Sequence, residues 1–478
     1  MVSKFLVPIK QISAVLGAAL LMSWPALYNG FPLLFFGDSL AYLASGEGVA
    51  RALFLRDFSL CCADRSLIYS LVILPFHWNI TPWPIVGLNA ILTAYVIWLV
   101  VRSLLPRRSH IAYFAVVVLL SVLTGLGWSV SFIMPDILGP VLYLSVYLIA
   151  FCWDSLFRGE RQSVVLIAWW ALASHASHLI LAGGLCILVA LMFKVQAQSL
   201  HLWAKGVGRV VAITLVAALA QLALYTYLFG EPVLFGKQYP FLLARVVTDV
   251  PGRSYLQEHC GELDLAICEH VHELPDAPWQ FLWPKDGIWQ SSSPAKRDQL
   301  YKEEMRVVLG TIYEYPWAQL RVSIVHFWHQ LNTFGLSEHA VDWWHSNDFD
   351  KFFPNAKSGF LQSRHAQQTL HVGFFTSVQA WTVAVSLLVI GIWSLLLRQG
   401  WSRRLIGLTA VIIFVVVANA GVTGVLSQVE DRYQCRVIWL VPLLAILVVL
   451  KWREQRGSPT TSAEQDFRRH RESENTPE

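Results

Sequence analysis

Residues 163–193 have the sequence SVVLIAWWALASHASHLILAGGLCILVALMF, a long apolar stretch without a Lys, Arg, Asp or Glu. About 20 apolar residues are enough to cross the hydrocarbon core of a bilayer, so a single helix of this length would overshoot it. The polar motif SHASH at 174–178 interrupts the stretch. We therefore predict two short membrane helices that meet near residues 174–178.

The composition of the whole chain agrees with a membrane protein. Of its 478 residues, 55% are hydrophobic and only 14% are charged, and the mean hydropathy is +0.49. Soluble globular proteins carry about 25% charged residues, so a soluble enzyme and a disordered chain are both disfavoured. The net charge of +4 is too small to indicate a nucleic-acid partner. The 21 Trp, 15 Tyr and 26 Phe suit membrane–water boundaries.

The same length criterion, applied along the chain, predicts an all-α polytopic protein with ten transmembrane helices. The first span is expected to remain as an anchor, because its apolar run is long and no small-residue cleavage site follows it. Besides the helix pair within 163–193, the predicted spans are 8–28, 83–101, 110–127, 136–153, 208–229, 374–397, 404–427 and 437–451.

Basic residues predict the orientation of these spans. With the N-terminus in the cytoplasm, 16 Lys and Arg fall in the inner segments and five in the short outer segments. We therefore predict a multi-pass protein of the cytoplasmic (inner) membrane with both termini in the cytoplasm. Its parts are an N-terminal transmembrane module (1–229) with a long first outer loop (29–82), an outer segment (230–373), C-terminal transmembrane helices (374–451) and a disordered cytoplasmic tail (452–478).

The outer segment, 230–373, has the composition of a soluble domain. Within it, residues 318–331 (AQLRVSIVHFWHQL) place apolar side chains at helical spacing, which predicts an amphipathic helix lying along the membrane surface. Cys260 and Cys268 are candidates for a disulfide, because the periplasm is oxidising. A zinc site involving the histidines within 259–273 is an alternative, although their spacing matches no standard ligand pattern.

Under this topology, the polar side chains beside apolar helix ends all fall on the outer face. Ionisable groups at membrane depth are costly, so a functional role is the default hypothesis. Helix capping, headgroup anchoring and helix–helix hydrogen bonding are the structural alternatives. The residues are Asp38, Tyr42, Asp64 and Arg65 in the first loop, Asp136 at the mouth of the fourth span, His175 and His178 in the helix pair, and Glu430, Asp431, Arg432 and Arg436 before the last span.

These residue types suit one kind of reaction. A carboxylate near an apolar wall can act as a general base, because desolvation raises its pKa. Arg and His at the membrane rim can hold a phosphate. Together they suit transfer from a lipid phosphate in the bilayer to an acceptor hydroxyl that arrives from outside. The lack of a P-loop or a GxGxxG strand–helix motif agrees with a reaction that needs no nucleotide.

Four motifs resemble the GT-C superfamily of integral-membrane glycosyltransferases, to which the bacterial aminoarabinose transferases and the protein O-mannosyltransferases belong. The resemblance covers about 1–230 and 375–451, and the outer segment resembles no family. The motifs are GDSLAYL (37–43), MPDI (134–137), WWALASHASHLILAG (169–183) and DRYQCRVIWLVPLLAIL (431–447).

The resemblance implies inverting transfer of a sugar from a polyprenyl-phosphate-linked donor to a glycan, lipid or protein acceptor. It implies that Asp38 is the general base and that Asp136 positions a substrate. His175 and His178 stand where relatives often carry Lys. No metal or other cofactor is expected. Binding of the donor phosphate or the substrate is assigned to Tyr42, Arg65, His175, His178, Arg432 and Arg436.

Two other functions compete with glycosyl transfer. A transporter or flippase for lipid-linked envelope precursors would place charges in mid-span or use broken helices around a midplane site. Here the mid-span positions are nearly free of charge, which disfavours that function. A non-catalytic envelope scaffold would use the outer segment but would not need the carboxylates at the rim.

Reporter fusions test the predicted topology. We expect alkaline phosphatase fused after Arg108 to be inactive, because this basic loop is predicted to be cytoplasmic. The matched fusion within residues 259–273 should be active, because that segment is predicted to lie outside. Phosphatase activity after Arg108 would contradict both the orientation and the gathering of polar residues on the outer face.

Overall fold

The computed structural model describes residues 9–59, 65–107, 109–196, 199–230, 232–234, 239–340, 349, 353–396 and 401–456. Helices dominate these residues, and their only β pairing is an isolated bridge between Leu33 and Phe132, which confirms the all-α class. Six helices in this part of the chain are long and apolar enough to span a membrane. Ten spans therefore stay a prediction. The six are Trp83–Leu104, Ala176–Val195, Ala204–Phe229, Val372–Leu395, Arg403–Leu426 and Asp431–Glu454.

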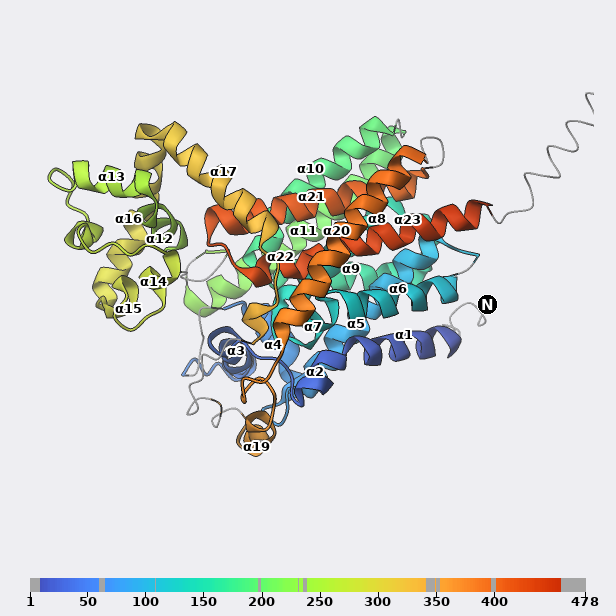
Figure 1. The fold of residues 1–478 in the computed structure, drawn as a ribbon. Coiled ribbons are helices and arrows are strands. Elements are labelled where there is room, and N and C mark those ends of the chain that lie inside the picture. Colours follow the sequence, from blue (N-terminus) through green and yellow to red (C-terminus); the bar gives the residue numbers. More distant parts are fainter. Residues whose placement is uncertain are drawn as a thin grey trace, which may run out of the picture.

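The first described helix begins, and the last one ends, on the same side of the bundle. Figure 1 shows the start of α1 and the end of α23 at one end, and the helices of the outer segment at the opposite end. α1 packs against α5 and α6, and α5 packs against α8. The N-terminal elements are α1 (Ile9–Met22), α2 (Trp24–Asn29), α3 (Phe36–Leu55), α4 (Leu67–His77), α5 (Trp83–Leu104), α6 (Ser109–Leu123), α7 (Leu126–Ser131), η2 (Pro135–Ile137), α8 (Leu138–Phe151) and η3 (Trp153–Ser155).

The apolar stretch 163–193 is divided as its sequence predicts. α9 (Arg158–Ala173) ends before the SHASH motif, and α10 (Ala176–Val195) begins within it. His175 caps α10, because its Nδ1 accepts a hydrogen bond from the backbone N–H of Ser177 at 3.2 Å. Both helices are longer than the predicted short pair, and α10 by itself is long enough to cross a bilayer.

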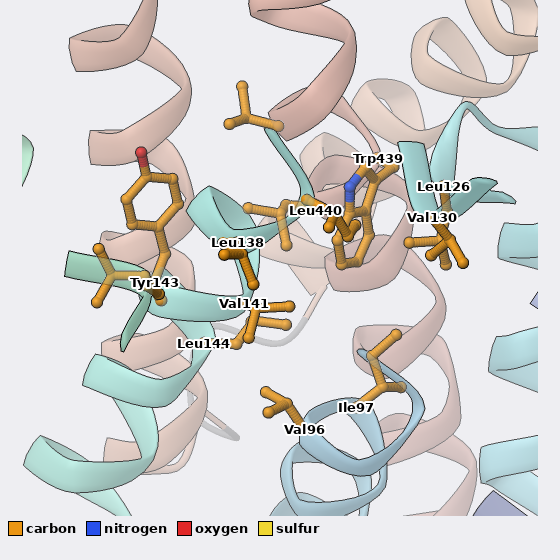
Figure 2. Close-up of a cluster of buried hydrophobic side chains, with 14 of the residues drawn as sticks. Val96, Ile97, Leu126, Val130, Leu138, Val141, Tyr143, Leu144, Trp439 and Leu440 are labelled. Atoms are coloured by element: carbon orange, nitrogen blue, oxygen red, sulfur yellow. The ribbon is translucent and has the colours of Figure 1, made fainter. Parts of the chain in front are cut away.

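A buried apolar cluster joins the N-terminal and C-terminal helices. Trp439 and Leu440 lie against side chains of α5, α7 and α8 (Figure 2). Trp439 is fully buried. Lipid tails are as apolar as these side chains, so the hydrophobic effect does not drive helices together within a bilayer. Close packing of side chains holds the helices together instead. The C-terminal elements are α20 (Val372–Leu396), α21 (Arg403–Leu426), α22 (Asp431–Ile438) and α23 (Leu440–Arg456), which follow α11 (Leu200–Phe229) and the outer segment.

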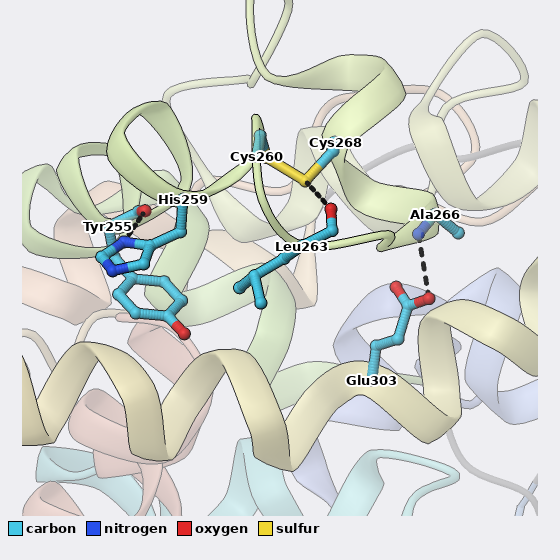
Figure 3. Close-up of a disulfide and its surroundings, with 7 residues drawn as sticks. All are labelled: Tyr255, His259, Cys260, Leu263, Ala266, Cys268 and Glu303. Carbon is cyan, nitrogen blue, oxygen red and sulfur yellow. Dashed lines mark hydrogen bonds between the residues drawn. A yellow bond between two sulfur atoms is a disulfide. The ribbon is translucent and has the colours of Figure 1, made fainter.

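The helices of the first part of the outer segment, residues 241–314, have an apolar core of their own, which includes Leu256, Phe281 and Leu300. Cys260 and Cys268 form a disulfide beside this core (Figure 3), so the expected pairing is confirmed. A zinc site could then not use either thiol as a ligand, because both sulfur atoms are in that bond. The elements are α12 (Phe241–Thr248), α13 (Val250–His259), η4 (Ala266–His270), α14 (Pro278–Leu282), α15 (Ile288–Ser291), α16 (Pro294–Glu314), α17 (Pro316–Asn332), η5 (Ser337–His339), η6 (Pro354–Ala356) and α19 (Lys357–Leu361).

The predicted amphipathic helix at 318–331 is confirmed as α17, which joins the outer segment to α21 of the bundle (Figure 1). One face of α17 packs on α21, and the other leaves Trp317 and Trp328 with 80% and 63% of their surface exposed. An exposed apolar face with Trp side chains suits a helix at a membrane interface. Its position along the membrane surface stays a prediction.

The structure corrects one predicted boundary. The tail was expected to be disordered from residue 452, but α23 continues to Arg456. Its last turn carries Arg453 and Arg456, and basic side chains in that position favour the helix by interacting with its carboxyl-terminal dipole. Residues 457–478 lie outside the described part of the chain.

Gly424 allows α17 to pack closely against α21. A substitution at Gly424 therefore tests the packing of these two helices. A Cβ at Gly424 would lie 2.8 Å from the carbonyl oxygen of His326. We expect Gly424→Ala to lower the free energy of unfolding by about 1–3 kcal/mol, because backbone has to move. Gly391→Ala is the matched control, since a Cβ there meets nothing within 4 Å. Thermal unfolding in detergent measures the stability of both variants. Equal stability of the two would contradict close packing of α17 against α21 at Gly424.

Candidate functional site

A cavity of about 690 Å³ lies at the outer-segment end of the bundle. Most of the lining residues belong to the bundle, and the outer segment contributes Tyr239, the start of α12 and Trp283, which follows α14. The cavity brings together residues that are far apart in the sequence. Of the predicted site residues, Asp38, Tyr42, Arg65, Asp136, His175, Arg432 and Arg436 line it.

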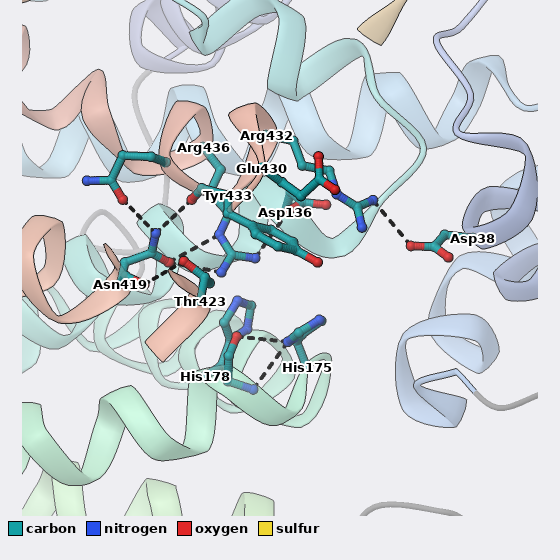
Figure 4. Close-up of polar contacts among 12 residues, drawn as sticks. Asp38, Asp136, His175, His178, Asn419, Thr423, Glu430, Arg432, Tyr433 and Arg436 are labelled. Atoms are coloured by element: carbon teal, nitrogen blue, oxygen red, sulfur yellow. Dashed lines mark hydrogen bonds and ion pairs between the residues drawn. The ribbon is translucent and has the colours of Figure 1, made fainter. Parts of the chain in front are cut away.

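Asp38 is held between two arginines. Arg65 donates a hydrogen bond of 2.5 Å to Oδ1 of Asp38, and Arg432 donates one of 3.2 Å to Oδ2. Figure 4 shows Arg432 reaching from α22 toward Asp38, which lies in the first turn of α3. All three side chains are less than one-fifth exposed. The carboxylate also benefits from the positive end of the α3 dipole.

The pKa of Asp38 differs from the expectation drawn from sequence. Burial disfavours the charged carboxylate, and alone it would raise the pKa. The charges and hydrogen bonds of Arg65 and Arg432 together outweigh burial and lower the pKa below its ordinary value of 3.8. The expected rise is therefore wrong for this arrangement, in which Asp38 is the counter-ion of two guanidinium groups.

A second ion pair lies deeper in the cavity. Arg436 donates a hydrogen bond of 3.2 Å to Asp136, and its Nη2 donates another of 2.9 Å to Oδ1 of Asn419. Asn419 of α21 is fixed in turn, because its amide donates to the backbone oxygen of Tyr433 at 2.7 Å. Arg436 is nearly fully buried, so its partners determine where its guanidinium lies.

Glu338 is a member of the cluster that the sequence did not reveal. Its Oε2 lies 3.2 Å from Nε of Arg432, and its Oε1 accepts a hydrogen bond from the Arg432 backbone N–H. Burial raises the pKa of Glu338 well above its usual range, although Arg432 opposes this effect. Asp38 is therefore the stronger acid of the two carboxyl groups that flank Arg432. Nothing in the local sequence around Glu338 indicates this role.

The two histidines of the SHASH motif have different surroundings. His175 lines the cavity, but burial and the nearby Arg436 and Arg432 lower the pKa of its imidazole to about 3. At neutral pH the imidazole therefore adds no positive charge, and binding of the donor phosphate by His175 stays a prediction. His178 does not line the cavity. Its Nδ1 lies 2.6 Å from the carbonyl oxygen of Ala171, so it joins neighbouring turns of the helix pair.

Tyr42 and Asp431 take no part in the ion pairs with arginine described above. Tyr42 lines the cavity and packs edge-on against Tyr69, with ring centres 5.0 Å apart. Asp431 accepts a hydrogen bond of 2.6 Å from the backbone N–H of Gly335, which fixes the turn after α17 on α22. Asp64 lies outside the described residues.

The charges that line the cavity leave a surplus. Among its described lining residues, three Arg side chains face two Asp side chains, and the histidine is neutral. Glu338 also flanks Arg432, but burial raises the pKa of its carboxyl and favours the uncharged form, so one positive charge is unmatched while Glu338 is protonated. A phosphodiester or a singly ionised phosphate carries the one negative charge that would balance it. The arrangement can therefore bind a phosphate through guanidinium groups that already have carboxylate partners.

One side of the cavity is apolar and open. Ile180 of α10, Phe229 of α11 and Leu426 of α21 line it, and each has 41% or more of its surface exposed. These side chains lie on helices that are long enough to span a bilayer. The cavity thus presents an apolar side toward the surface of the bundle and a charged side toward its interior.

Comparisons with known proteins do not identify the chain. A scan against protein-family models and searches of curated proteins and of solved structures give no match. The site is therefore interpreted from its own geometry.

A double-mutant cycle tests the deeper ion pair. We expect Arg436→Met to destabilise the protein by about 3–5 kcal/mol, because it leaves the carboxylate of Asp136 buried without its cation. Adding Asp136→Leu should restore most of that loss, since no buried charge then remains. Thermal unfolding in detergent measures each variant. A double variant that is as unstable as Arg436→Met alone would show that the two groups are not coupled.

Proposed function

We propose that this chain is a membrane glycosyltransferase of the GT-C type. It moves a sugar, with inversion, from a polyprenyl-phosphate-linked donor to an acceptor at the outer face of the inner membrane. Both termini lie in the cytoplasm, and ten helices cross the bilayer. The observation that carries this proposal is the single cavity in which Asp38, Arg65 and Arg432 meet beside an apolar wall.

The donor would use both sides of the cavity. Its phosphate would lie against Arg65, Arg432 and Arg436, where it matches the surplus positive charge. Its prenyl chain would follow Ile180 and Leu426 outward between α10 and α21, because those side chains are apolar and exposed. A lipid-linked donor is favoured over a soluble one, because a soluble sugar phosphate has no apolar chain that would contact the apolar side of the cavity.

Donor binding would activate the base. A phosphate competes with Asp38 for the guanidinium groups of Arg65 and Arg432. As those groups turn toward the phosphate, their hold on Asp38 weakens, and burial then dominates and raises the pKa of the carboxyl. The carboxylate becomes a better proton acceptor at the moment when the donor is in place.

The chemical step follows from these positions. The acceptor hydroxyl oxygen forms a bond to the anomeric carbon of the donor, and its proton passes to Asp38. The bond from that carbon to the phosphate oxygen breaks, and its electron pair leaves with the polyprenyl phosphate. Arg65 and Arg432 stabilise the charge that develops on the leaving oxygen. Asp136 acts as a positioning residue, because it holds Arg436 in place.

A deletion strain tests the function and separates it from transport. We expect the strain to accumulate polyprenyl-phosphate sugar in the outer leaflet, where impermeant periodate oxidises it in intact spheroplasts. Accumulation in the inner leaflet alone would contradict transfer and would support a flippase.

Complementation of that strain tests the base. We expect Asp38→Asn to leave the donor uncleared, with transfer reduced by about 10²–10⁴-fold, because the amide cannot accept the proton. Glu47→Gln is the matched control, since Glu47 is an acid on the same helix whose partners are Arg51 and Asn79, outside the cavity. Lipid extraction and immunoblotting measure donor and protein levels. Full clearance by Asp38→Asn would remove Asp38 from this role.

A further inference from the structure

We propose that the acceptor is itself a carbohydrate, and that Tyr239, Phe241 and Trp283 of the outer segment bind one of its sugar rings by stacking. This inference rests on the glycosyl transfer proposed above. It assigns a substrate class to a wall of the cavity that the phosphate chemistry does not use. We call these three side chains the aromatic wall.

The aromatic wall belongs to the outer segment and faces the charged side chains of the bundle. All three residues line the cavity. Tyr239 and Trp283 have ring centres 4.7 Å apart, and Phe241 and Trp283 have ring centres 6.2 Å apart. All three are only partly buried, whereas Phe281 beside them is fully buried in the core. The wall is therefore a surface of the cavity, with the core behind it.

The elements behind the aromatic wall hold it in place. Glu304 of α16 accepts hydrogen bonds of 2.8 and 3.1 Å from the backbone N–H groups of Leu242 and Leu243, which fixes the start of α12 next to Phe241. Trp289 lies behind Tyr239, with ring centres 5.6 Å apart. A ring surface that is ordered in advance loses little entropy when a ligand stacks on it.

Arg65 joins the aromatic wall to the base. Its guanidinium carbon lies 5.7 Å from the ring centre of Trp283, and the same guanidinium donates a hydrogen bond to Asp38. One side chain therefore lies between the wall and the carboxylate. The guanidinium lies over the ring of Trp283, so a sugar would stack there once Arg65 has turned to the donor phosphate, and its hydroxyl groups would then lie near Asp38. This is the geometry that deprotonation of a sugar hydroxyl requires.

The chemistry of the wall favours a sugar over the other acceptor classes. A pyranose has a face of weakly positive C–H groups that suits the negative face of an aromatic ring, and a polar edge that suits nearby charges. A lipid acceptor would compete with the donor for the apolar side at Ile180 and Leu426, which lie on helices long enough to span a membrane and not on the outer segment. An aromatic wall carried by the outer segment fits an acceptor that approaches from water.

Binding of native glycans tests the inference. The probe is the oligosaccharide mixture released by mild acid from the envelope of the native host, with a peptide pool from the same envelope as the comparison. We expect saturation-transfer NMR with the full chain in detergent to show signals from sugar ring C–H protons and none from the peptides. Signals from peptides alone, or from neither pool, would overturn the carbohydrate assignment.

Matched variants locate the binding on the wall. Trp283→Leu keeps bulk but removes the ring, and we expect oligosaccharide binding to weaken by roughly ten-fold. Trp283→Phe should retain most of it. Trp279→Leu is the control, because Trp279 lies on α14, which ends directly before Trp283, but does not line the cavity. Equal losses in the two Leu variants, or equal binding by Trp283→Leu and the unaltered protein, would overturn the role of Trp283.

A separate ligand distinguishes failure of this inference from failure of the proposed function. Polyprenyl phosphate should raise the melting temperature of the unaltered protein and of Trp283→Leu by the same amount, because it binds on the charged and apolar sides. If polyprenyl phosphate stabilises the protein while no oligosaccharide binds, only the carbohydrate acceptor is refuted. If polyprenyl phosphate has no effect on a folded protein, the donor site itself is refuted.

Discussion

The pairing of Asp38 with Arg65 and Arg432 is the interaction on which the site depends. Arg65 is 27 residues from Asp38 in the sequence and Arg432 is 394 residues away, so one carboxylate ties the first outer loop to the helices that end the chain. Three ionisable groups can stay buried at this depth only because each has a partner. The same pairing keeps guanidinium groups in position for a phosphate, so structure and proposed chemistry use the same contacts.

Two different surfaces meet around that pairing. Membrane helices supply the apolar side at Ile180 and Leu426, and the outer segment supplies the aromatic side at Trp283. A lipid-linked substrate needs the first, and a water-borne substrate needs the second. A reaction between the two has to occur at the boundary between bilayer and water. In the proposed reaction, the ion pairs of the cavity lie at this boundary.

The sequence predicted the all-α class and the division of one long apolar stretch, whereas only six of the ten predicted spans are matched by a described helix long enough to cross a membrane. The apolar length and the SHASH motif were enough to divide 163–193, because membrane helices follow from composition. Polar residues beside the ends of apolar helices were enough to select Asp38 and Arg432 as candidate site residues. The roles of Glu338 and Trp283 could not be predicted, because both lie in the outer segment, and only tertiary folding brings them to the cavity. The lowered pKa of Asp38 was missed for the same reason, since it depends on partners that are remote in sequence.

The most direct test is the pKa of Asp38 with and without polyprenyl phosphate, measured by infrared difference spectroscopy against Asp38→Asn. Without the lipid phosphate, the carboxyl should titrate below its ordinary value of 3.8, because two guanidinium groups hold it charged. With the lipid phosphate bound, its pKa should rise, because those groups turn to the phosphate. A pKa that does not change on binding would show that the arginines are not shared and would contradict the proposed activation of the base.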